Sequence, residues 1–131
     1  MARGAPGVSF EVAGRVAVEA AWQNRAVTAE GSVDEQLRFA IANKRLVQMS
    51  YKGRVRVAEP HDYGVQKGVT RLLTYQRSAV GGGPRKDVTG WRLLDLPKIE
   101  RCLVLDETFP GSRGQAHHAH NVWDVLYARV K

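Results

Sequence analysis

The sequence predicts a mainly β protein, a small and strongly bent antiparallel β-barrel preceded by one α-helix. A single segment with a clear helix-start signal begins at Ser32. Five short strand-like segments follow it, and turn residues rather than helices separate them, which favours antiparallel neighbours. The segment from Trp91 to Phe109 holds the densest apolar pattern of the chain, yet it carries two cations, Arg92 and Lys98. Cations set into a core-forming segment suggest a barrel that binds an anion.

Length and composition limit the class of protein. With 131 residues, 44% hydrophobic and 25% charged, the chain predicts one soluble domain plus a tail. No apolar run approaches the ~20 residues of a membrane helix, and the first residues lack the apolar core of a secretory signal. Cys102 is the single cysteine, so no intramolecular disulfide can form. We therefore expect a cytoplasmic protein without membrane contact.

Three regions are expected along the chain: an extension over residues 1–31, the barrel domain over 32–114, and a segment over 115–131 that packs on the barrel. Apolar residues alternate from Val8 to Trp22, as in a strand, but residues 17–23 are mostly helix formers. The extension is thus an added strand, an interaction arm or unstructured sequence.

The helix is predicted from Val33 to Asn43. Ser32 can cap its N-terminus, and Glu35 three residues later completes a capping box. An apolar stripe at helical spacing is expected to face the core. Its members are Leu37, Ala40 and Ile41.

The strands are predicted from alternation and turn residues. Arg54 and Arg56 share one face opposite two valines, and Pro60 ends this strand or marks an edge. The predicted strands are residues 46–51, 54–57 resuming at 61–65, 69–76, 91–96 and 101–105. Turns are expected at residues 52–53 and 66–68, a mobile loop at 79–84, and a break at Pro97.

The C-terminal region leaves two alternatives open. Val122, Trp123, Leu126, Tyr127 and Val130 have helical spacing, but Val125, Tyr127 and Arg129 also alternate as in a strand. Either form should pack on the barrel, because exposing Trp and Tyr is costly.

No catalytic or cofactor chemistry is predicted. A metal site at His117, His118 and His120 would need a second ligand pair, which is missing, so a solvated loop is favoured. Cys102 lies mid-strand among apolar residues, where a thiol is inert. The glycines at 81–83, near Arg85 and Lys86, lack the ending of a phosphate-binding P-loop. We expect a protein that is not an enzyme and holds no metal.

Positive charge is concentrated in the strand region. Residues 38–101 contain 14 Lys/Arg against 5 Asp/Glu, a local net charge of +9, whereas the rest of the chain has 6 against 8. This distribution favours an anionic partner, although a well-solvated basic surface is the alternative. Tyr51, Tyr63 and Tyr75 are interspersed and suit base stacking. The candidate ligand-binding residues are Arg54, Arg56, Arg71, Tyr75, Arg92 and Lys98.

Residues 37–109 resemble the WYL domain family of bacteria. The late family motif Arg-x-Phe-x-Leu-x-Arg-Ile is matched by Arg92, Leu94, Leu96, Lys98 and Ile99, followed by Asp106 and Phe109. Earlier matches are Ala40-Ile41, Arg45, Val47, Tyr51 and Pro60. Of the Trp-Tyr-Leu triplet only Leu72 is kept, and Lys98 replaces an arginine, which loses the bidentate fork.

The resemblance implies an SH3-like (Sm-like) barrel in a stand-alone, divergent module. It also implies a regulator that senses a nucleic-acid or nucleotide ligand without catalysis. The alternative is a protein-interaction or self-assembly module that uses the barrel edge and the N-terminal arm. Self-assembly would make the protein a homo-oligomer.

Overall fold

A computed structural model describes residues 22, 31–82, 88–114 and 121–131. Their elements are α2 (Val33–Asn43), β1 (Arg45–Tyr51), β2 (Arg54–Gln66), β3 (Val69–Val80), β4 (Gly90–Asp95), the 3-10 turn η1 (Leu96–Lys98), β5 (Ile99–Thr108) and β6 (Val125–Arg129). The protein is thus mainly β with one described α-helix of several turns, as predicted. None of the described helices has the length and hydropathy needed to cross a membrane.

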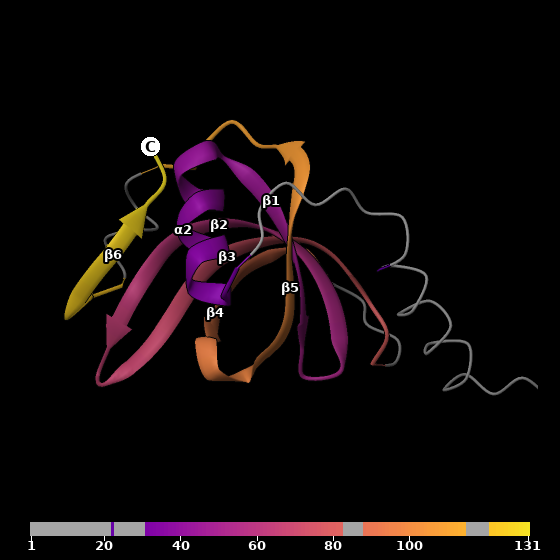
Figure 1. Cartoon of the computed structure of the whole chain (residues 1–131), viewed down its shortest axis with the longest axis horizontal. Helices are drawn as coiled ribbons and strands as arrows, with labels where there is room; N and C mark the ends of the chain where they lie inside the picture. Colours follow the sequence, from indigo (N-terminus) through magenta and orange to yellow (C-terminus); the bar gives the residue numbers. More distant parts are fainter. Residues whose placement is uncertain (1–21, 23–30, 83–87, 115–120) are drawn as a thin grey trace, which may run out of the picture.

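The six strands form one antiparallel sheet with the order β4-β3-β2-β1-β5, and β6 pairs with β2. β2 is the central strand because its first half pairs with β1 and its second half with β6 (Figure 1). The sheet is strongly bent: the Asp95 backbone N–H at the end of β4 donates to the Tyr51 hydroxyl of β1 at 3.1 Å. No ladder joins β4 to β5 in the described part of the chain, so the sheet does not close into a barrel there.

Helix α2 has the predicted bounds and cap. The Ser32 hydroxyl accepts from the Glu35 N–H at 3.1 Å, and the Glu35 carboxylate accepts from the Ser32 N–H at 2.9 Å. Both halves of the capping box are therefore made. The helix lies across the sheet between β5 and β6 (Figure 1) and packs Leu37, Ala40 and Ile41 into the core.

The core is built from alternate residues of β1 and β5 beneath this helix. Val47 and Met49 are fully buried, as is Val104 opposite Val47. Each such aliphatic side chain contributes about 1.5–3 kcal/mol by leaving water. The turns at 52–53 and 67–68 fall where expected, and both of their lysines have positive φ.

Two sequence predictions need correction. β2 runs through Pro60 instead of ending there, because the β1 ladder stops at Ala58 and the β6 ladder starts at Asp62. A residue without an N–H is tolerated in that gap. The expected loop at 79–84 begins later, since Ala79 and Val80 pair with β2.

The C-terminal region is settled in favour of the strand. β6 pairs with β2 through Val125 and Leu126. The helical spacing of the apolar residues did not decide the structure, because the second half of β2 pairs with this segment as a strand. Val130 follows it and is buried in the core. The extension at 1–31 lies outside the described residues except for Trp22, which is buried under the Arg101 guanidinium, and Gly31.

Candidate anion-binding face

Three of the predicted arginines lie on one face of the sheet, which we call the Arg56 face. Arg54 and Arg56 alternate with the valines of β2, so they point the same way. Arg56 donates from Nη1 to the Gln76 side-chain oxygen on β3 at 3.0 Å. Gln76 is opposite Gly90 in the β3–β4 ladder, and Arg92 two residues later shares its face. The Arg56 face is defined by Arg54, Arg56, Gln76 and Arg92.

Glycines flank this face and make room for its arginines. A Cβ at Gly82 would lie 2.7 Å from Cγ of Arg54, and a Cβ at Gly90 would lie 3.2 Å from Nη1 of Arg92. Arg92 also donates from Nη1 to the Trp91 carbonyl at 2.9 Å, which holds its guanidinium back along β4. The backbone therefore fixes where these cations sit.

Arg71 and Lys98 are placed elsewhere, around one carboxylate. Arg71 Nε donates to Asp95 Oδ1 at 2.9 Å, and Lys98 Nζ lies 3.6 Å from Asp95 Oδ2. Asp95 therefore offsets part of their positive charge. These two residues and the Arg56 face form separate groups.

Tyr75 lies on the opposite face of β3, beside a charge cluster that surrounds the buried Glu59. Its register partners are Glu59 on β2 and Trp91 on β4. The Arg113 guanidinium stacks on the Tyr75 ring, with Cζ 3.7 Å from the centroid. The tyrosines expected to stack on bases are otherwise internal, since Tyr51 and Tyr63 are 5% and 1% exposed. Their rings are packed in the core.

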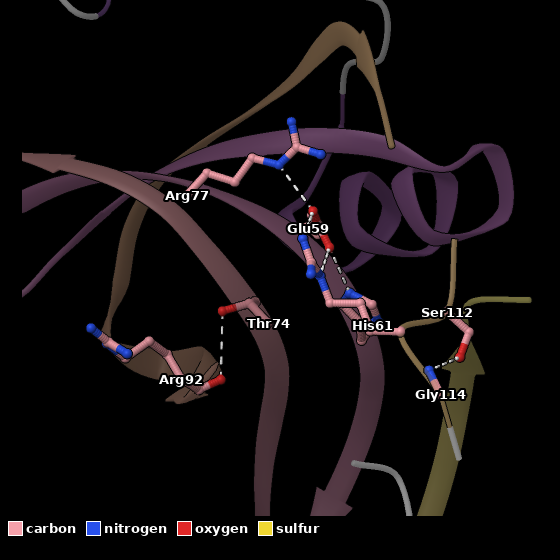
Figure 2. Close-up of polar contacts among 8 residues, drawn as sticks. Glu59, His61, Thr74, Arg77, Arg92, Ser112 and Gly114 are labelled. Carbon is pink, nitrogen blue, oxygen red and sulfur yellow. Dashed lines mark hydrogen bonds and ion pairs between the residues drawn. The ribbon is translucent and has the colours of Figure 1, made fainter. Parts of the chain in front are cut away.

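Glu59 is the centre of this cluster, and sequence analysis missed it. Its carboxylate accepts from Arg77 Nε at 2.9 Å and lies 3.0 Å from His61 Nε2 (Figure 2). Arg113 donates to both oxygens at 2.8 Å. Burial raises the pKa of Glu59, but these partners outweigh it and bring the pKa down to about 2. Figure 2 shows Arg92 pointing away from this cluster, which places the two groups on different faces.

Comparisons of the chain with protein-family models, with curated proteins and with solved structures found no match.

The other candidates from the sequence are one thiol and residues outside the described part of the chain. Burial raises the pKa of the Cys102 thiol to about 12, which keeps it protonated at neutral pH. No group of three metal-ligating side chains occurs among the described residues. His117, His118 and His120 lie outside the described residues, as do Arg85 and Lys86.

A carboxylate between Ala58 and Pro60, where two predicted strand segments meet, was the one sequence signal for the cluster around Glu59. A buried acid requires cationic partners, but those partners come from β3 and from the loop after β5, 18 and 54 residues away. Sequence spacing could not identify them.

Proposed function

We propose that the Arg56 face binds the phosphates of single-stranded nucleic acid or of a nucleotide, without catalysis. The observation that carries this proposal is the placement of three arginines from β2 and β4 on the face of Gln76, where Arg56 bonds Gln76 and Arg54 is 6% exposed. Arg56 and Arg92 are half-buried, so their guanidinium groups are positioned by the sheet while remaining accessible. Guanidinium groups fixed in this way can donate two hydrogen bonds to one phosphate.

The charge distribution supports the same proposal. A local net charge of +9 over residues 38–101 attracts polyanions over several ångströms. Arg71 and Lys98 contribute to this field but not to the Arg56 face, because Asp95 holds both of them. Their role in the proposal is long-range attraction.

The proposal extends to family and fold. We propose that the chain is a divergent WYL-type module with an SH3-like (Sm-like) arrangement. The support is the meander of β1 to β4 with β5 returning to pair with β1, the turn η1 between β4 and β5, and the contact that brings β4 close to Tyr51. The ordered match from Arg92 to Phe109 supports the family.

The test is binding of fluorescein-labelled oligo-dT by anisotropy at several salt concentrations, with ATP as competitor. Arg56→Gln and Arg92→Gln should each weaken binding about three- to tenfold, and each should lower the slope of log K against log salt by about 0.7. Lys67→Asn is the matched control, since it also removes one charge but lies at the far end of the β2–β3 hairpin. If the arginine variants bind as tightly as Lys67→Asn, the proposal is wrong.

A second candidate function is protein interaction through β6. Its residues Val125, Leu126 and Tyr127 are 40–49% exposed, and Val122 just before it is 83% exposed. An exposed apolar strand can pair with another chain. Sedimentation velocity of the full chain and of Leu126→Lys tests this function: self-assembly predicts a concentration-dependent mass that the substitution abolishes.

A further inference from the structure

A groove of about 460 Å³ lies between the C-terminal half of α2 and strand β6. It is separate from the Arg56 face, because α2 and β6 form its walls. The volume falls within the range of small-molecule sites. The lining residues are Arg38, Ile41, Ala42, Lys44, Ala128, Arg129 and Lys131.

The rim of the groove is strongly basic. Four of the seven lining residues are cations, and none of the seven has an acidic side chain. Two of these cations are held from outside the groove: Arg38 Nε by Asp34 at 3.1 Å, and Arg129 by the buried Asp62 at 3.0 and 3.1 Å. The ion pair of Arg38 uses its Nε, which bonds both oxygens of Asp34 at 3.1 Å.

The Lys44 side chain and the Lys131 backbone meet at one end of the groove, both against Gly111. A Cβ placed on Gly111 would lie 3.3 Å from Cε of Lys44 and against the backbone oxygen of Lys131, so the Lys44 stem and the Lys131 backbone both approach this glycine. The Ser112 N–H also donates to that carbonyl at 3.2 Å. The loop after β5 therefore fixes this basic end.

The floor is apolar. Ile41 is 3% exposed and belongs to the core, and Ala42 and Ala128 add small side chains that leave space above them. At the side, the Arg38 guanidinium lies over the Tyr127 ring, with Cζ 4.6 Å from the centroid. A ligand in this groove would place an apolar body on the alanines and an anionic group at the end that Lys44 lines.

We propose that the groove between α2 and β6 binds a small organic anion, a phosphate monoester or a carboxylate with a compact apolar body. Arg38 and Arg129 are pre-positioned by their aspartates, and Lys44 supplies positive charge for the anionic group at its end of the groove, which Lys131 also lines. The small side chains of Ala42 and Ala128 set the size of the apolar body. This site is independent of polyanion binding at the Arg56 face.

The experiment uses the full ¹⁵N-labelled chain and four probes: phenyl phosphate, phenylacetate, inorganic phosphate and benzyl alcohol. Phenyl phosphate or phenylacetate should produce saturable amide shifts at residues 41–44 and 128–131. The tighter of the two identifies the anionic group. Inorganic phosphate and benzyl alcohol should each bind at least about fivefold more weakly, because each lacks half of the ligand.

Two substitutions test the geometry. Lys44→Asn should weaken binding of the better probe about three- to tenfold, and Ala42→Leu should weaken it by filling the groove. Lys67→Asn is the control for Lys44→Asn, because both lysines have left-handed φ, 54° and 50°, which asparagine tolerates. The proposal is overturned if no probe shifts the groove amides, if Lys44→Asn binds like Lys67→Asn, or if benzyl alcohol binds as tightly as the anions.

Discussion

Arg113 and Glu59 form a two-pronged ion pair in which Nε and Nη2 reach the two carboxylate oxygens, each at 2.8 Å. Glu59 is 1% exposed, whereas the Arg113 side chain is 40% exposed. The pair therefore joins the loop after β5 to the central strand β2. It closes a span of 54 residues without a covalent bond.

Glu59→Gln is predicted to destabilise the protein by about 2–4 kcal/mol, because it leaves cations facing a neutral amide beside the core. Urea denaturation followed by tryptophan fluorescence measures this change. Glu100→Gln is the control: Glu100 is exposed, and its side chain accepts only from the Ser50 hydroxyl among the described residues. The control should change stability by less than about 0.5 kcal/mol. Equal effects of the two substitutions would contradict a structural role for the cluster.

Stability should fall in acid because of the same carboxylate. The pKa of Glu59 is lowered from 4.5 to about 2, so its contribution is complete above pH 4.5 and is lost as the pH falls toward 2. The pKa of Asp34 is also lowered, chiefly by the hydrogen bond that Asp34 accepts from Tyr63, so its contribution to stability is likewise lost in acid. Urea midpoints at pH 7, 4.5 and 3 should decline for the wild type. They should decline less for Glu59→Gln, and an unchanged decline would assign the acid sensitivity to other groups.

The local elements of this fold could be predicted from sequence because their causes are local. The capping box at Ser32 and the strand predicted over residues 46–51 rest on short-range signals, and the structure confirms both elements. Pro60 misled the prediction because whether a proline ends a strand depends on the neighbouring strands. Those neighbours, β1 and β6, come from opposite ends of the described chain.

The candidate site was harder to predict because it depends on side-chain direction. Arg71 and Arg92 look alike in sequence, yet the strand alternation places them on opposite faces of the β3–β4 pair. The partner of Arg71, Asp95, was visible in sequence, but only the register shows that the two residues are opposite each other. Charge density predicts an anionic partner, and register decides which cations are available to it.

The difference between Arg92 and Lys98 gives a direct test of this point. Lys98→Gln should weaken oligo-dT binding by less than about twofold, because Asp95 already offsets part of its charge at 3.6 Å. Arg92→Gln should have the larger effect at every salt concentration. Equal losses of oligo-dT affinity in the two variants would indicate that the bound oligonucleotide also contacts the turn η1.

Gly82→Ala is predicted to displace Arg54 and to destabilise the protein. Gly82 has a φ of +70°, and the new Cβ would lie 2.7 Å from Cγ of Arg54. Backbone strain and the clash together should cost about 1–3 kcal/mol. Displacement of the Arg54 guanidinium should also weaken oligo-dT binding.

Gly53→Ala is the control, because Gly53 has a similar φ of +77° with nothing within 4 Å of the added Cβ. It should lose stability through backbone strain yet bind oligo-dT like the wild type. If Gly82→Ala also retains full binding, Arg54 is not part of the phosphate site.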